Sequence, residues 1–340
     1  MRIQFDGTLC YHSGVSGPSD RTISAPLPES GAVRASATEH APSARESHST
    51  IEALVTLLGR ESKSSNLTII RSRLLEAGAA ALPYLERTRV SNDDEEPAGA
   101  MALEIRRRML GADWLRWASI SDVDLEAGAL LIDRFGDPLR DHVPVRCALD
   151  DLATELGRRL DGVSRPKPTI EILTSYLFDE AGLRGNTDDY EDPENSYLSR
   201  VVERKIGIPV SLSVVMLLIA RRLRLPLVGI GMPGHFIVRY GASESGPYLD
   251  AFGRGKVLTR DECVAWLRAS GFEFEPRMLR PVDSRQIVAR MLRNLVAVFS
   301  KRGAAAEVAI LSQYLRAVLA PTVLVDIPAG SEPSAESAAG

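Results

Sequence analysis

Residues 207–240 read GIPVSLSVVMLLIARRLRLPLVGIGMPGHFIVRY, and the pattern that decides the fold changes within them. Apolar residues in the first half, over 211–223, recur at helical spacing. They are Leu212, Val215, Met216, Ile219 and Leu223. Short apolar runs bounded by glycine or proline follow at 227–230, 236–240 and 248–252. We therefore expect one helix followed by a small antiparallel sheet, which is an α+β module.

The sequence on both sides of this module is dominated by helical spacing. Expected helices lie at 51–58, 69–82, 101–117, 124–135, 144–160, 170–180, 260–269, 284–302 and 304–319. Residues 165–168 read RPKP, which predicts a stiff connector and a domain boundary. Cys147 lies on the apolar side of its expected helix and is interpreted as a packed core thiol.

Composition divides the chain into five parts. Residues 1–49 are rich in Ser, Gly, Pro, Ala and Thr without periodic apolar residues, which predicts a disordered tail. We expect a helical region at 50–165, an α+β domain at 166–303, a C-terminal helix at 304–321 and a second tail at 322–340.

Length and composition restrict the class of protein. With 340 residues, 44% of them hydrophobic and 25% charged, the chain can bury a full core and has the composition of a soluble protein. It has no run of about 18 apolar residues and no secretory leader pattern, so we expect a cytoplasmic protein without membrane association. Three widely separated cysteines argue against a disulfide framework and a zinc site, and we expect no metal and no cofactor.

Several short motifs resemble the SirB-like branch of the transglutaminase-like superfamily. They are GN at 185–186, Tyr190, NSYL at 195–198, GIPVSLS at 207–213, PGHF at 233–236 and LDAF at 249–252. The resemblance extends roughly over residues 120–320. It implies that the helical N-terminal region packs on a transglutaminase-like, papain-like core, with the domain at 166–303 as that core.

The same resemblance implies a catalytic pair, with His235 as base and Asp250 as the group that orients it. Fifteen residues separate them, enough for a strand, a hairpin and a return strand, so both can lie on adjacent antiparallel strands. A carboxylate beside an imidazole fixes its tautomer and stabilises its protonated form. The alternative is a histidine with a structural role only.

The sequence departs from the superfamily pattern at the nucleophile, because the expected helix start carries no cysteine. Cys263 lies beyond the sheet, and the other two cysteines lie well before the helix. Ser211 is the candidate nucleophile, since a helix N-terminus stabilises negative charge. Serine is also favoured there as an N-cap. A role for Ser213, or a mechanism without an enzyme nucleophile, remains open as well.

A polar loop precedes this helix, and the resemblance places it beside the same site. Asn186, Tyr190 and Asn195, with Ser213 on the helix, are candidate substrate-binding residues. Asn and Tyr side chains can donate to a developing oxyanion. The alternative is ordinary turn chemistry, because Asn is a common loop residue.

Basic residues concentrate in two windows of the chain. Residues 200–240 contain seven bases and one acid, and residues 277–302 contain another seven bases and one acid. A basic face would suit a polyanion such as tRNA, or a phosphopantetheine carrier with its acidic protein. The alternative is a set of solvated Arg-rich helix faces.

Two classes of function follow. In the first, the protein is an acyltransferase that moves an activated acyl group, with aminoacyl-tRNA as first candidate donor, to a small amine, hydroxyl or hydroxylamine acceptor. The resemblance includes relatives in natural-product and antibiotic biosynthesis, where such donors occur. In the second, the protein is a non-catalytic binding or regulatory protein that retains the fold. The paired His235 and Asp250 favour the first class, and the missing cysteine favours the second.

Overall fold

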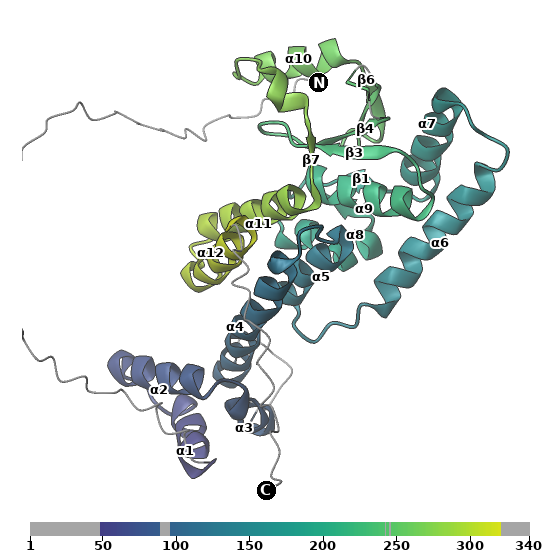
Figure 1. Ribbon diagram of the computed structural model, residues 1–340. Coiled ribbons are helices and arrows are strands. Elements are labelled where there is room, and N and C mark those ends of the chain that lie inside the picture. The colour runs from purple at the N-terminus through teal and green to yellow at the C-terminus, as the bar shows by residue number, and fades with distance from the viewer. Residues whose placement is uncertain (1–47, 89–95, 242, 245, 321–340) are drawn as a thin grey trace, which may run out of the picture.

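The computed structural model describes residues 48–88, 96–241, 243–244 and 246–320. Helices pack around a small five-stranded sheet and a two-stranded one, which confirms the predicted α+β class (Figure 1). The expected tails lie almost wholly outside the described residues. Within the described residues, no helix combines the length and apolar character needed to cross a membrane.

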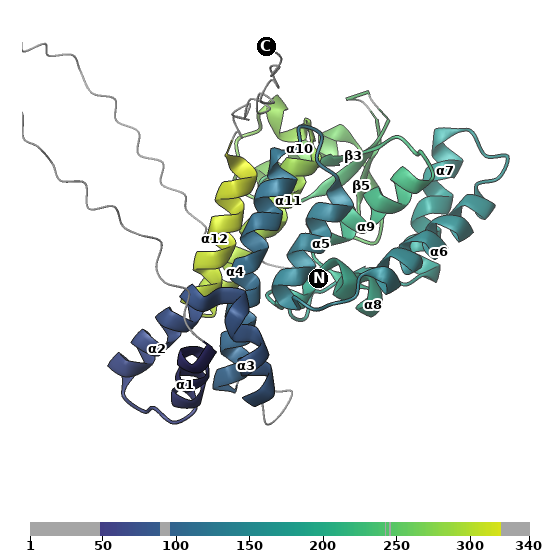
Figure 2. The same ribbon diagram turned by 60° about the horizontal axis from the view of Figure 1, so that its bottom comes forward.

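An N-terminal group of helices has its own core. Its elements are α1 (His48–Leu58), α2 (Ser64–Ala77), η1 (Gly78–Ala81), α3 (Leu82–Thr88) and the first half of α4 (Pro97–Ser119). Leu54, Leu74, Leu85 and Met101 are buried between them. Figures 1 and 2 show these helices at the end of α4 that lies away from the sheet. Burial of the i, i+3, i+4 positions of α1 explains why the sequence pattern identified this region.

The second half of α4 enters the main core of the molecule. The other elements that build this core are α5 (Leu125–Gly136), α6 (Val143–Arg159), α7 (Pro166–Thr174), α8 (Leu198–Arg204), α9 (Pro209–Arg222), α11 (Ser284–Lys301) and α12 (Ala305–Leu319). A π-helical turn, η2 (Ser175–Glu180), extends α7. Helix α9 is buried from Pro209 to Ala220, because helices cover one side of it and the sheet covers the other.

Two local expectations are wrong. Residues 165–168 do not form a connector, because Pro166 begins α7. Proline is tolerated in the first helical turn, since its missing N–H would have no helical partner there. Cys147 is exposed rather than packed in the core. The buried face of α6 passes through Val145 and Leu149 and leaves Cys147 outside.

The sheet has five short strands, and all neighbouring strands are antiparallel. They are β3 (Leu227–Ile230), β4 (Ile237–Tyr240), β5 (Tyr248–Asp250), β6 (Lys256–Leu258) and β7 (Pro281–Val282), in the order β6-β5-β4-β3-β7. Val238 and Leu249 pair and face the core that contains α9. Ile237 and Tyr248 alternate with them and face α10 (Arg260–Ala269) on the opposite side (Figure 1).

A second, two-stranded sheet lies beside the start of α9. Strand β1 (Arg184–Gly185) runs parallel to β2 (Ile206–Gly207). The turn η3 (Pro193–Ser196) and helix α8 lie between these strands in the sequence. This pair brings the expected polar loop to the first turn of α9.

Candidate functional site

A proline-glycine turn places His235 beside Asp250. The His235 N–H donates to the Met232 carbonyl at 3.2 Å, and Gly234 has a φ of 73°. Proline followed by a residue with positive φ is typical of a type II turn, which explains why glycine is needed at 234. The turn ends just before β4, and Asp250 ends the neighbouring strand β5.

His235 Nε2 and Asp250 Oδ1 are 3.0 Å apart, with side chains 12% and 19% exposed. The backbone N–H groups of Phe252 and Gly253 also bond to the Asp250 carboxylate. Burial raises the pKa of Asp250, but the hydrogen bond and charge of His235 and these N–H groups outweigh it, so the pKa lies below its usual range. The carboxylate is therefore ionised at neutral pH and can fix the imidazole tautomer.

Aromatic side chains surround the pair. The Trp266 ring centroid, from α10, is 5.1 Å from that of His235, and the Phe252 ring is 6.5 Å away, edge on. Tyr190 packs edge on against Phe252 at 6.0 Å. Trp266 is 37% exposed and Tyr190 is 42% exposed, so the partly exposed pair lies beside accessible aromatic surface.

Arg290 from α11 supports the turn that carries His235. Its Nη1 donates to the Met232 carbonyl at 3.2 Å. Desolvation raises the pKa of Tyr190, although the charge of Arg290 opposes that shift. The Tyr190 hydroxyl therefore stays protonated at neutral pH and is available as a donor. Neither Arg290 nor Trp266 was identified from the sequence, because each lies in a helix whose surroundings depend on the tertiary fold.

Ser211 lies at the third position of α9 rather than at its N-cap. Its side chain is fully buried. The hydroxyl donates to the Asn195 carbonyl at 2.6 Å and accepts from the Ile208 N–H at 3.0 Å. This geometry is that of a residue that ties η3 to the start of the helix. The proton that a base would have to remove is already held by a backbone carbonyl.

No hydrogen bond joins the Ser211 hydroxyl to the His235 ring in the described chain. A Cβ at Gly207 would lie 2.7 Å from Ser211 Oγ, and a Cβ at Gly185 would lie 2.6 Å from the Phe252 ring. Gly185 and Gly207 are register partners in β1 and β2. The packing therefore runs from His235 through Phe252 and the two glycines to Ser211.

The predicted substrate-binding residues fall into different environments. The Asn186 amide donates to Asn195 Oδ1 at 3.0 Å, and Asn195 Nδ2 donates to the Asp189 carbonyl at 2.8 Å. These bonds hold the loop together. Ser213 is fully buried, and its hydroxyl has no hydrogen-bond partner in the described chain. Tyr190 alone of the four contacts the aromatic group beside His235.

Ion pairs reduce the basic character expected of residues 200–240 and 277–302. Five of these bases pair with carboxylates: Arg200, Arg204, Arg222, Arg277 and Lys301. Their partners include Glu126 on α5 and Glu191 in the loop before η3. The sequence windows missed these acids because they lie elsewhere in the chain. Arg221, Arg224, Arg280 and Arg293 stay exposed without an ion pair to any described residue.

Comparison with known proteins agrees with this architecture. Residues 144–293 match the sequence profile of the transglutaminase-like superfamily. The chain is 34% identical over 195 residues to a UPF0162 protein of Xylella fastidiosa (strain 9a5c), covering 54% of this chain and 69% of that relative. It is 28% identical over 177 residues to a UPF0162 protein of Vibrio cholerae, covering 51% and 65% of the two chains.

A eukaryotic relative shares the same region. Human F-box only protein 21 is 27% identical over 206 residues, which cover 52% of this chain and 32% of that protein. No solved structure matches the chain.

Proposed function

Because the chain belongs to the UPF0162 family and carries a transglutaminase-like domain, we propose that it transfers an activated acyl group to a small acceptor. The acceptor is an amine, a hydroxyl or a hydroxylamine. The observation that carries this proposal is the 3.0 Å contact between His235 Nε2 and Asp250 Oδ1 in a partly exposed position. The sequence motifs of the chain also support its placement in the SirB-like branch.

In the proposed reaction, His235 is the general base. Asp250 accepts a hydrogen bond from Nε2–H of His235, so Nδ1 is free to accept a proton. Nδ1 takes that proton from the acceptor as the acceptor's nitrogen or oxygen attacks the acyl carbonyl carbon. A bond forms between acceptor and acyl carbon, and the bond to the leaving oxygen or sulfur breaks. The leaving group then takes the proton back from the imidazolium. In this proposal the Tyr190 hydroxyl donates to the oxyanion as it develops.

The surroundings of Ser211 support direct transfer without an acyl-enzyme. Serine needs a neighbouring base to become a nucleophile, and the Ser211 proton is bonded to the Asn195 carbonyl instead. A donor that is already activated as an ester or thioester requires less assistance than an amide. We therefore propose an ester or thioester donor.

Aminoacyl-tRNA is the first donor to test, and an acyl-carrier thioester is the second. The support is the set of exposed, unpaired arginines described above, although the five ion pairs weaken it. This donor would fit a cytoplasmic enzyme of a specialised pathway such as antibiotic biosynthesis.

The test is acyl transfer from a panel of charged tRNAs and acyl thioesters to hydroxylamine and methylamine. We expect product with at least one activated donor, and loss of it by about 100-fold or more in His235→Ala, because general-base catalysis contributes factors of this size. Asp250→Asn should also slow the reaction strongly. His48→Ala, on α1, is the matched control and should leave the rate unchanged. Transfer that persists in folded His235→Ala would refute the proposed role.

The second candidate is a binding protein that retains the fold without catalysis. The buried Ser211 and the exposed aromatic residues Trp266 and Tyr190 favour it. In that case no donor in the panel reacts. Trp266→Ala then abolishes binding of any charged tRNA or acyl thioester in the panel that the wild type binds.

A further inference from the structure

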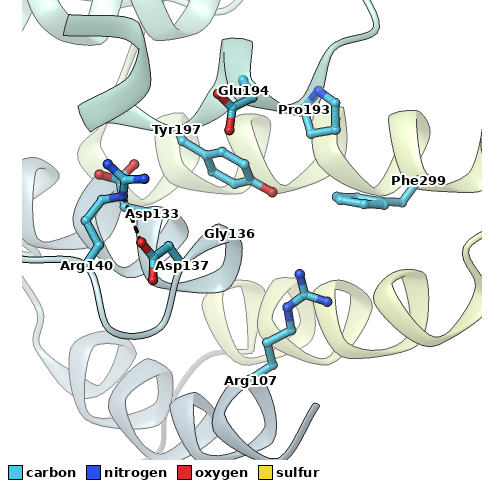
Figure 3. Close-up of a pocket in the computed structure, with 9 residues that line it drawn as sticks. All are labelled: Arg107, Asp133, Gly136, Asp137, Arg140, Pro193, Glu194, Tyr197 and Phe299. Carbon is cyan, nitrogen blue, oxygen red and sulfur yellow. Dashed lines mark ion pairs between the residues drawn. The ribbon is translucent and has the colours of Figure 1, made fainter. Parts of the chain in front are cut away.

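A polar cavity lies away from His235, on the helical side of the molecule. It has a volume of about 240 Å³ and lies between α4, α5, η3, α8 and α11. Figure 3 shows the Arg107 guanidinium pointing toward the space between the Tyr197 ring and Phe299. The polar lining also includes Asp133, Asp137, Arg140 and Glu194.

Asp133 presents an unmet acceptor in this cavity. It is 1% exposed, and Oδ2 accepts the Ser199 N–H at 2.9 Å. Oδ1 is buried and has no hydrogen-bond partner among the described residues. The Ser199 hydroxyl is also without a partner there, but it is close enough to lower the pKa of Asp133. The nearest basic nitrogen, His142 Nε2, is 3.9 Å from Oδ2, beyond hydrogen-bond distance, and is itself unpartnered in the described chain. A buried carboxylate oxygen without a donor is costly, so a donor group is expected to fill this position.

The other carboxylates of the lining are already neutralised. Asp137 pairs with Arg140 at 3.5 Å. Glu194 pairs with Arg200 at 2.5 Å and lies 3.7 Å from Arg204. Asp133 is therefore the lining carboxylate with an open oxygen, and a positively charged donor would meet it best.

The cavity also has free donors for an anion. Arg107 Nε donates to the Phe135 carbonyl oxygen, and Arg107 Nη1 donates to the Glu307 carboxylate. Its Nη2 has no hydrogen bond to the described part of the chain. Among the described residues, the Arg140 side chain has only the long ion-pair contact with Asp137. Guanidinium groups bind carboxylates with two parallel N–H donors where geometry allows.

We propose that this cavity binds a small zwitterion of the free amino acid class. The ligand's ammonium group donates to Asp133 Oδ1, and its carboxylate accepts from Arg107 and Arg140. The volume of about 240 Å³ is enough for a small ligand. This site is independent of the proposed acyl transfer at His235.

Binding should depend on pH through Asp133. Burial raises the pKa of Asp133 to about 6, against hydrogen bonds from Ser199 and the charge of Arg140. Tyr197 also faces Asp133 and stays protonated, because burial raises its pKa. Burial, with the charges of Arg134, Arg146 and Arg140, lowers the pKa of His142, so that ring is neutral near pH 7. Affinity for an ammonium group should therefore fall as pH decreases through about 6.

Calorimetry and saturation-transfer NMR on the full chain test the site with glycine and L-alanine as probes. Methylammonium and acetate each carry one half of the zwitterion. We expect saturable millimolar or tighter binding of at least one amino acid, weaker binding of each half, and lower affinity at pH 5 than at pH 7.5.

Two variants locate the binding. Asp133→Asn should weaken amino acid binding about tenfold or more, whereas Asp161→Asn, an exposed acid outside the cavity, should change nothing. Arg140→Gln should weaken binding of the amino acid but not of methylammonium. Absence of binding by both probes at millimolar concentration would overturn the proposal, and so would amino acid binding in Asp133→Asn and Arg140→Gln with the affinity of the wild type. If the protein transfers no acyl group but still binds the amino acid, the proposed function at His235 fails and the amino acid site stands.

Discussion

Asp250 and Asp133 each lie near a histidine, yet their pKa values shift in opposite directions. Asp250 receives a hydrogen bond from His235 and its pKa decreases, whereas Asp133 lies 3.9 Å from His142 without a hydrogen bond and its pKa increases to about 6. Burial raises the pKa of both carboxyl groups. At Asp250 the hydrogen bond and charge of His235 outweigh burial, whereas at Asp133 burial dominates. At neutral pH both carboxylates are largely ionised, but only Asp250 is stabilised in that form.

Asp133→Asn should stabilise the protein at neutral pH. The native pKa of about 6 exceeds the unfolded value of 3.8, so the native state binds more protons between these values and stability decreases as pH rises through that window. Replacing the carboxyl by an amide removes this loss, with a gain of about 1 to 3 kcal/mol at pH 7 and little gain below about pH 4. Urea unfolding at both pH values measures it, and an equal gain at both would contradict the explanation.

Helix α5 is packed so closely against α4 and α11 that one of its glycines has no space for a side chain. A Cβ at Gly128 would lie 2.7 Å from the Trp117 ring and 2.7 Å from Val288. A Cβ at Gly111, in α4, would meet nothing within 4 Å. Helix propensity alone favours alanine over glycine at both positions.

Gly128→Ala should therefore destabilise the protein by about 1 to 3 kcal/mol, the range for overpacking of a core. Gly111→Ala is the matched control and should stabilise it by about 0.5 to 1 kcal/mol, because only the helix propensity changes. Denaturant unfolding of the two variants provides the measurement. A stabilised Gly128→Ala would show that the three helices can separate at low cost.

The sequence predicted elements that have a clear period or a clear boundary. Helix α9 and strands β3, β4 and β5 were identified, since apolar runs of three or more residues between Gly and Pro carry a signal. Strands β1, β2 and β7 have two residues each, too few for any period. The pairing of His235 with Asp250 was expected, but Trp266 and Arg290 reach the site through tertiary packing that one sequence does not reveal.

At the scale of the whole molecule, charge depends on the fold more than on the sequence window. Arg222 pairs with Glu126 and Asp150, which are distant in the chain. A count of bases per window therefore overestimates the surface charge. Arg221 and Arg293, exposed and without an ion pair in the described chain, are the residues on which tRNA binding would depend.

Reversal of these two charges tests tRNA as a partner. Arg221→Glu with Arg293→Glu should weaken tRNA binding and reduce its salt dependence. The slope of log affinity against log salt concentration is roughly −0.7 to −0.9 for each phosphate that the protein neutralises, so losing bases makes the slope shallower. Arg60→Glu with Arg158→Glu changes the net charge equally, but on α6 and near α1, and should have a smaller effect. Filter binding at several salt concentrations gives both slopes. Equal effects of the two double variants would refute a specific basic face.

Single-turnover transfer by Ser211→Ala and His235→Ala is the most direct test of acyl transfer by His235 without a serine nucleophile. We expect Ser211→Ala to be less stable by about 1 to 3 kcal/mol, because it loses buried hydrogen bonds, yet to transfer within about threefold of the wild-type rate. Folded His235→Ala should be slower by about 100-fold or more. The contradicting result is a folded Ser211→Ala that no longer transfers, together with an acyl-enzyme mass in the wild type that is absent from this variant.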